Sequence, residues 1–383
     1  MAEEELVRVP NLDVAQTLFE LSLPESDQMA LEAAFLDAVK KDGMAPVYDQ
    51  ACKDHDLSHD AALSKQMHAD SAEKLKQLDA NIKDAEENLG ETEIRDAYMA
   101  KAQHYARIGA KEEAEAAFRQ VYEKSISVGQ RMDVVFYLLR IGFFFDDKEL
   151  ITRNLEKAES LLEEGGDWER RNRLKVYKGL HLLTMREFSQ ATSLFLDTVS
   201  TFTCVELMPY NDFIGLTVLG AVFALPRTEL NKKVVKGPEI QEALHDLPLH
   251  KRLLSSLYGC KYADFFAALA EVEGVFKTSR YLAQHTRFYV RELRIKAYQQ
   301  LLQSYRSVTL ASIASSFGVT EAFIDAELSR FIAAGRLNCK IDKVAGVVET
   351  TRPDHRNAQY QEIIKKGDMM LNRLQKLGQV ISI

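Results

Sequence analysis

Residues 286–351 constrain the fold of this chain more than any other stretch. Their apolar residues first repeat at helical spacing, then alternate in short runs, and glycines or hydroxyl residues separate the segments. The predicted elements, in order, are a helix at 286–302, an edge strand at 308–310, helices at 311–317 and 321–334, and strands at 337–341 and 347–350. A helix, a strand, two helices joined by a tight turn and a hairpin predict a winged helix, a helix-turn-helix with a β wing.

The boundaries of the two central helices are the best defined. Gly318 is placed to end the first helix and Thr320 to cap the next, because glycine tolerates the left-handed conformation and threonine accepts a backbone hydrogen bond. The second helix should bury one continuous apolar face. That face consists of Phe323, Ile324, Leu328, Phe331 and Ile332.

Winged helices often bind DNA, so the charge of this one matters. Between residues 306 and 349 five acidic residues balance five basic ones, and the helix that would read DNA carries Glu321, Asp325 and Glu327 against Arg330 alone. Phosphate binding requires several neutralising cations on one surface. The sequence therefore argues against nucleic acid and favours a protein contact at the edge of the wing, where strands offer unpaired backbone groups. The candidate residues are Leu337, Cys339, Ile341, Val347 and Val348.

The C-terminal tail predicts one long helix after a break at 351–354. Its apolar residues recur every three or four positions up to Ile381, which is a heptad stripe. Such a helix either folds back on its own wing or joins helices of other chains. The candidate contact residues are Tyr360, Ile363, Ile364, Met370, Leu371, Leu374 and Leu377, and Gly367 leaves room for another backbone to approach.

The region before the winged helix predicts stacked helical pairs. Residues 61–89 should form a long, mostly exposed helix with a narrow apolar stripe, either packed on the next repeat or projecting as an arm. From residue 94 the spacing of small and aromatic residues is typical of tetratricopeptide-like pairs, with irregular recurrence. The repeat positions are Tyr98, Ala102, Tyr105, Gly109, Ala114 and Phe118, then Ala158 with Leu162, and Ala191 with Phe195.

Composition excludes several classes of protein. The chain has 383 residues, 46% of them hydrophobic, and a net charge of −8, which argues against general binding to nucleic acid or anionic membranes. The most apolar stretch, 213–225, is too short to cross a bilayer and predicts a buried helix. The four cysteines lie far apart, which indicates buried free thiols, and the acidic first residues are unlike a signal peptide.

Patterns that carry chemistry are weak or missing. Cys52, His55 and His59 have metal-like spacing, but no fourth ligand follows, so we expect no metal site. No phosphate-binding loop, nucleophile elbow or metalloisopeptidase motif is present, so we expect neither an enzyme nor a cofactor. The densest basic run should be a solvated face, with an acidic partner as the alternative. It comprises Arg170, Arg171, Arg173, Lys175 and Lys178.

Two further segments carry a resemblance to a known family. Residues 255–266, Ser-Ser-Leu-Tyr-Gly-Cys-Lys-Tyr-Ala-Asp-Phe-Phe, resemble the segment by which PCI domains enter their last helical pair. Residues 11–25 resemble the start of a PCI subunit of the proteasome lid. PCI proteins also occur in the signalosome and in a translation initiation factor. The resemblance covers nearly the whole chain.

This resemblance implies a mainly α fold: a right-handed TPR-like α-solenoid capped by a winged-helix PCI subdomain with a small β wing, plus a long C-terminal helix. It implies an N-terminal helical arm (1–93), helical repeats (94–285), a winged helix (286–352) and a C-terminal bundle helix (353–383), with 190–352 together forming the PCI domain.

The function that the resemblance implies is a non-catalytic scaffold of the lid of the proteasome regulatory particle, in cytoplasm and nucleus. It would support lid assembly and ATP- and ubiquitin-dependent protein degradation. The implied partners are other PCI subunits of the lid, the small acidic lid protein, the lid deubiquitinase subunits through a helical bundle, and the ATPase ring. The alternatives are a paralogous signalosome subunit and an RNA-associated PCI module of a translation initiation factor.

Overall fold

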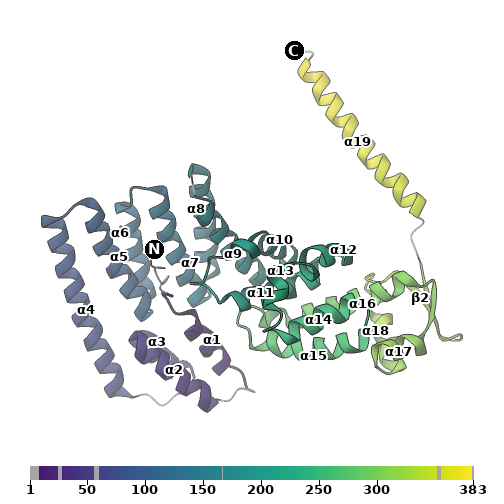
Figure 1. The fold of residues 1–383 in the computed structure, drawn as a ribbon, viewed down its shortest axis with the longest axis horizontal. Helices are drawn as coiled ribbons and strands as arrows, with labels where there is room; N and C mark the ends of the chain where they lie inside the picture. Colours follow the sequence, from purple (N-terminus) through teal and green to yellow (C-terminus); the bar gives the residue numbers. More distant parts are fainter. Residues whose placement is uncertain (1–7, 25–27, 56–59, 166, 352–354, 382–383) are drawn as a thin grey trace. The chain divides into compact units, whose positions relative to one another are not determined.

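The computed structural model describes residues 8–24, 28–55, 60–165, 167–351 and 355–381 (Figure 1). Among these, helices dominate and three short strands form one sheet. The chain divides into two compact units, Met1–Ser255 with Ala268–Val290, and Ser256–Ala267 with Arg291–Ile383. The boundary lies within helices α14 to α16, whereas the sequence suggested a division at residue 286. The fold is mainly α with a small sheet, as expected.

The first unit begins with four helices before the repeats. They are α1 (Leu12–Leu21), α2 (Gln28–Asp42), α3 (Ala45–Asp54) and α4 (Ala61–Asn88). Helix α4 buries only one narrow side, including Met67, Ile82 and Ala85, and packs against α3 and α5. The prediction of a long, largely exposed helix is confirmed, and of the two alternatives the structure has the packed one.

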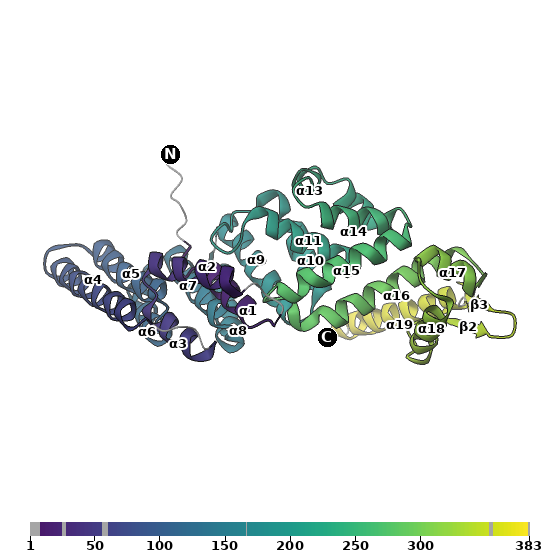
Figure 2. The same ribbon diagram turned by 90° about the horizontal axis from the view of Figure 1, so that it is seen from below.

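Stacked antiparallel helices follow, with α4, α5 and α6 side by side in both ribbon views (Figures 1 and 2). Small residues sit where neighbouring helices touch: Ala102, Ala114, Ala158 and Ala191 are fully buried. Leu161, rather than the expected Leu162, is the buried partner of Ala158. The helices are α5 (Glu91–Ile108), α6 (Lys111–Lys124), α7 (Val128–Phe145), α8 (Lys148–Gly165), α9 (Trp168–Thr184) and α10 (Phe188–Thr198).

Gly109 ends α5 with φ +78°, and a Cβ atom there would lie 2.3 Å from the side chain of Val47. Both the left-handed backbone and the close approach of α3 therefore require glycine at this repeat position.

The remaining helices of this region are α11 (Tyr210–Ala224), α12 (Arg227–Leu230), α13 (Pro238–Ala243), α14 (Pro248–Tyr258), α15 (Tyr262–Thr278) and α16 (Thr286–Ser304). Helix α11 holds most of the apolar 213–225 stretch, and nine of its fifteen residues are buried, all of them within that stretch, so the predicted buried helix is confirmed. Within the part of the chain that the structure describes, no helix combines the length and apolar character needed to cross a bilayer.

The second unit contains the winged helix. After α16 come β1 (Ser307–Thr309), α17 (Leu310–Phe317), α18 (Glu321–Ala333), β2 (Cys339–Asp342) and β3 (Val347–Thr350). The strand order is β1-β3-β2, and both pairs are antiparallel, with Val308 and Ile341 opposite Val348. Gly318 adopts φ +66° and Thr320 accepts a hydrogen bond from the Phe323 amide, so both predicted caps are confirmed.

The core of the winged helix is aromatic. The ring centroid of Phe317 lies 4.8 Å from that of Tyr262 and 4.7 Å from that of Tyr298. Ile324, Leu328 and Phe331 of α18 are buried beneath them. The expected continuous face is narrower than predicted, because Phe323 is exposed and Ile332 is only half-buried. Because a helix is cylindrical, it buries the side chains that face the neighbouring helices and leaves those at the sides of its apolar face partly in water.

Candidate protein-binding surfaces

Helix α18, the helix that reads DNA in other winged helices, is fixed by a buried carboxylate. Glu327 is 4% exposed, accepts a hydrogen bond from the Tyr298 hydroxyl at 2.7 Å and forms an ion pair with the Arg294 guanidinium at 2.9 Å. Burial and the bond to Glu327 raise the pKa of Tyr298. From the sequence Glu327 counts among the acids of this helix, but the structure buries it, and α16 supplies the partners that compensate its loss of hydration.

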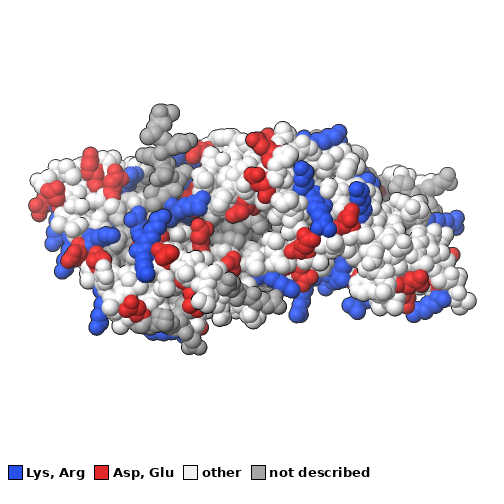
Figure 3. Space-filling model, turned by 60° about the horizontal axis from the view of Figure 1, so that its bottom comes forward, with Lys and Arg blue, Asp and Glu red and all other residues white. Residues whose placement is uncertain are grey.

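Two further ion pairs involve residues of α18 and the wing. Asp325 lies 3.0 Å from the Lys343 ammonium, and Arg336 forms an ion pair with Glu292. On the face drawn in Figure 3, blue and red side chains are interspersed along the chain and form no continuous basic stripe. The face shown therefore lacks the continuous basic surface that phosphate binding requires.

The candidate residues of the wing divide into two groups. Leu337, Cys339 and Val348 are at most 5% exposed and belong to the core of the domain, and burial raises the pKa of the Cys339 thiol. Their side chains are therefore not available to a partner, which corrects their assignment as contact residues. Ile341 and Val347 are half-buried and lie at the wing surface. Ile341 alternates with Cys339 and lies opposite Val348, so it shares their face but is less covered, whereas Val347 lies opposite Asp342 on the other face.

The outer edge of the wing remains a candidate contact. Strand β2 pairs only with β3 among the described strands, so its other edge carries the unpaired backbone groups. The Asp342 carboxylate accepts hydrogen bonds from the amides of Val344 at 2.9 Å and Ala345 at 3.2 Å, which fixes the turn. Val344 is fully exposed at its tip and was not among the predicted contact residues.

The C-terminal helix, α19 (His355–Ile381), has no apolar cover. All seven candidate residues are described, and their side chains are 55–67% exposed: Tyr360, Ile363, Ile364, Met370, Leu371, Leu374 and Leu377. Val380 and Ile381 extend the same surface, whereas Met369 is exposed on the other side of the helix. A Cβ atom at Gly367 would meet nothing within 4 Å. In this structure the helix thus does not pack on its own wing.

Comparison with protein-family models assigns most of the chain. The model of the 26S proteasome subunit RPN7 matches residues 60–233, and the PCI domain model matches residues 269–352. A model of the C-terminal helix of 26S proteasome regulatory subunit RPN7/PSMD6 matches residues 359–381, which coincide with α19.

Curated relatives match the chain from end to end. It is 51% identical to the 26S proteasome non-ATPase regulatory subunit 6 of Oryza sativa subsp. japonica, over 99% of this chain and 98% of the relative. It is 38% identical to the 26S proteasome regulatory subunit RPN7 of Saccharomyces cerevisiae, over 98% and 94%. The chain belongs to the RPN7 family of 26S proteasome regulatory subunits. The resemblance to PCI proteins seen in the sequence is thereby confirmed, and the relatives' names favour the proteasome over the signalosome and translation-factor alternatives.

Most basic residues of the dense run form ion pairs with acidic residues of the same chain. The Arg170 guanidinium lies 2.8 Å from Asp133, and that of Arg173 lies 2.7 Å from Glu206. Lys175 and Lys178 pair with acidic residues of α10 and α8, so four of the five basic residues have partners within the chain. The alternative of an acidic partner protein at this run loses its support.

The cysteines and the metal-like spacing give no site. All four cysteines are free, Cys52, Cys204 and Cys339 being buried and Cys260 half-buried. Burial raises the pKa of the Cys52 thiol, and His59 lies outside the described residues. Among the residues placed in the structure, no three His, Cys, Asp or Glu side chains gather as a cation-binding group.

Proposed function

We propose that the chain is a scaffold subunit of the proteasome regulatory-particle lid and acts through protein contacts, without catalysis of its own. In this role it supports lid assembly and, through it, ATP- and ubiquitin-dependent protein degradation in cytoplasm and nucleus. Its partners are other PCI subunits, the small acidic lid protein, the deubiquitinase subunits and the ATPase ring. Family membership supports a place in the proteasome regulatory particle, and the exposed apolar stripe of α19 is the observation that supports a role in protein contacts.

The stripe of α19 is an assembly surface in this proposal. A soluble chain rarely leaves so long an apolar face in water unless another molecule covers it. Each leucine or methionine that becomes buried in a bundle contributes roughly 1.5–3 kcal/mol. Several such residues along one helix would therefore dominate the free energy of joining helices from other subunits.

The wing supplies a second, smaller contact. The free edge of β2 would accept a strand of a neighbouring winged helix, with backbone hydrogen bonds giving affinity and side chains giving register. Ile341 lies on this edge strand, Val347 lies beside it on the central strand β3, and Val344 projects from the fixed turn. Leu337, Cys339 and Val348 would help only by supporting the strands from inside the domain.

Variants of α19 test the proposal. Leu374→Asp combined with Leu377→Asp, and deletion of residues 356–383, should block entry into the lid in a reconstitution followed by native gel electrophoresis. Melting temperatures should change little, because these side chains are already exposed in the free chain. Asn372→Asp combined with Gln379→Asp is the matched control: it adds the same two charges on the opposite side of the helix and should assemble normally.

Two results would contradict this role. If the truncated chain entered the lid at the normal rate, α19 would not be the assembly surface. If it unfolded on its own, the helix would be stabilising its own domain instead.

A further inference from the structure

Two adjacent methionines of α19 lie on different faces of the helix. Met370 follows Ile363 and precedes Leu377 by one heptad each, so it belongs to the apolar stripe. Met369 is turned by about 100° from Met370, and its neighbours one helical turn away are all polar. These neighbours are Lys365, Lys366, Asn372 and Arg373.

Both thioethers are accessible in the free chain, since Met369 is 54% exposed and Met370 is 67% exposed. Among the other methionines that the structure describes, Met29 and Met185 are also exposed. The rest are buried or half-buried: Met44, Met67, Met99, Met132 and Met208. Because oxidation requires access to the sulfur, we expect Met369 and Met370 to be among the first methionines that an oxidant reaches.

The charges beside the two sulfurs are matched. Lys366 and Arg373 each lie three or four positions from both Met369 and Met370, which places them one helical turn from either side chain. The two residues should therefore react with a neutral oxidant at similar rates in the free chain. They differ in what surrounds them once α19 is covered.

A peroxide converts a thioether to a sulfoxide in one two-electron step. The sulfur gives an electron pair to one peroxide oxygen, the S–O bond forms and the O–O bond breaks. With hydrogen peroxide, the proton of the transferred oxygen passes to the departing hydroxide, which leaves as water. Methionine sulfoxide reductases reverse the change with electrons from a thiol.

A sulfoxide at position 370 would place a strong hydrogen-bond acceptor within the apolar stripe. Ile363, Leu374 and Leu377, which share this side of the helix, have no side-chain donor that could satisfy it. Burying a polar group without a partner is unfavourable, so the sulfoxide would oppose the covering of the stripe. At Met369 the same oxygen would stay in water.

We propose that Met370 is a site of reversible oxidation, and that its sulfoxide prevents α19 from packing against helices of other chains. The inference rests on the assembly role of α19 proposed above. Peroxide acts on the free chain, in which the sulfur is exposed, whereas a covered Met370 is protected. The oxidation state of this one sulfur thus decides which free chains can assemble.

Two full-length variants test this directly. Met369→Leu leaves Met370 to be oxidised, and Met370→Leu leaves Met369. Each is treated with hydrogen peroxide until peptide mapping by mass spectrometry shows complete conversion, and dithiothreitol then reduces the thiols again. Reconstitution into a lid that lacks this subunit gives the concentration for half-maximal entry, and each variant is compared with its own untreated sample.

Oxidation should raise that concentration about tenfold or more in Met369→Leu, the effect of burying an unpaired polar group. It should change little in Met370→Leu, although Met29 and Met185 are oxidised equally in both variants. Treatment with the two sulfoxide reductases should restore entry. In the unsubstituted chain the two sulfurs should react at similar rates when free, and Met370 should become several-fold slower than Met369 in the lid.

Four results would overturn the proposal. Complete oxidation of Met370 could leave entry unchanged, both variants could lose entry equally, the reductases could fail to restore it, or Met370 could stay as reactive as Met369 in the lid. A fall in melting temperature that accompanies the loss would also exclude it, because the effect would then lie in the fold of the chain. Failure of the assembly role itself is distinct: Leu374→Asp with Leu377→Asp would then enter the lid normally.

Discussion

The ion pair between Arg173 and Glu206 provides a quantitative test of how the repeats are joined to the segment before α11. The Glu206 side chain has no solvent exposure, and one of its oxygens accepts from Arg173 at 2.7 and 3.1 Å and from the Tyr177 hydroxyl at 3.2 Å. Burial opposes the charge of Arg173, but the Glu206 carboxylate outweighs this effect and raises the pKa of Arg173. Each charge therefore depends on the other.

Removing one partner should be costly. Arg173→Met keeps much of the side-chain volume but leaves Glu206 buried without its cation, for which we expect a loss of about 3–5 kcal/mol. Combining it with Glu206→Leu removes both charges and should recover most of that loss, or even add stability. The free energy of coupling between the two sites should therefore be about 3 kcal/mol or more.

A second ion pair, with the same separation but greater exposure, shows how much of the coupling free energy comes from burial. Arg252 and Glu271 also lie 2.7 Å apart, but their side chains are 45% and 54% exposed. Arg252→Met and Glu271→Leu should show a coupling of at most about 1 kcal/mol.

Native-state amide hydrogen exchange in α9 and α14 measures both cycles, because a chain with two compact units need not unfold in one step. Equal coupling in the buried and exposed pairs would refute the reasoning.

Three further variants test packing, titration and the wing. A Cβ at Gly179 would lie 2.4 Å from the buried ring of Phe195, so Gly179→Ala should lower the free energy of unfolding by about 1–3 kcal/mol. A Cβ at Gly274 would meet nothing within 4 Å, so Gly274→Ala should raise the free energy of unfolding by about 0.5–1 kcal/mol. Denaturation curves measure both changes. Burial lowers the pKa of Lys296 from 10.5 to about 8. The folded chain thus releases this proton first, and its stability relative to Lys296→Met should rise between pH 8 and 10.5 in thermal melts; a constant difference would contradict this. Ile341→Asp and Val344→Asp should weaken lid incorporation, the latter with unchanged melting, and normal incorporation of both would remove the wing from the interface.

Local patterns determined the secondary structure and the fold class. Gly318 and Thr320 act at their own positions in the backbone, so their caps could be predicted without knowledge of the fold. The heptad spacing of α19 is likewise a property of consecutive residues, and all seven contact residues predicted from it are exposed in the structure. The alanines predicted at the contacts between repeat helices could be recognised in the same way, from their spacing along the chain, and they are buried in the structure.

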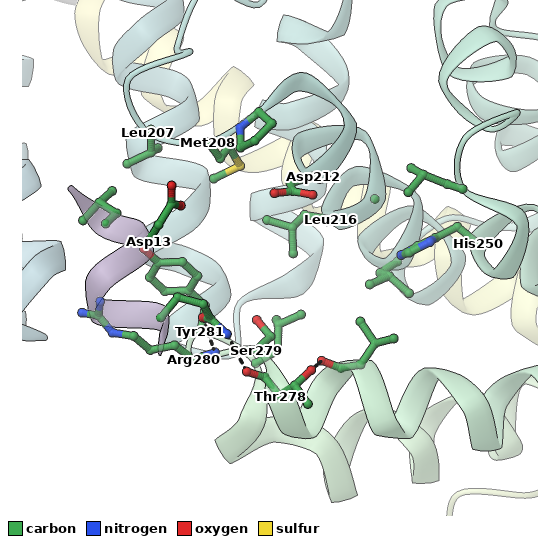
Figure 4. A pocket seen from close by; sticks show the side chains of 18 residues that line it. Asp13, Leu207, Met208, Asp212, Leu216, His250, Thr278, Ser279, Arg280 and Tyr281 are labelled. Carbon is green, nitrogen blue, oxygen red and sulfur yellow. Dashed lines mark hydrogen bonds between the residues drawn. The ribbon is translucent and has the colours of Figure 1, made fainter. Parts of the chain in front are cut away.

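Tertiary packing decided what the alternation of apolar and polar residues leaves open. Leu337, Cys339 and Val348 lie inward because the helices of the winged helix cover that face of the sheet, and a strand pattern alone is the same whichever face is covered. Glu327 is buried only because Arg294 and Tyr298 reach it from α16, a partnership between residues about 30 positions apart. The contact between α1 and α15 has the same origin, since Gln16 and the C-terminal residue of α15, Thr278, meet only in the folded chain (Figure 4). Charges and amides acquire their role from distant partners, and that information lies in the tertiary structure.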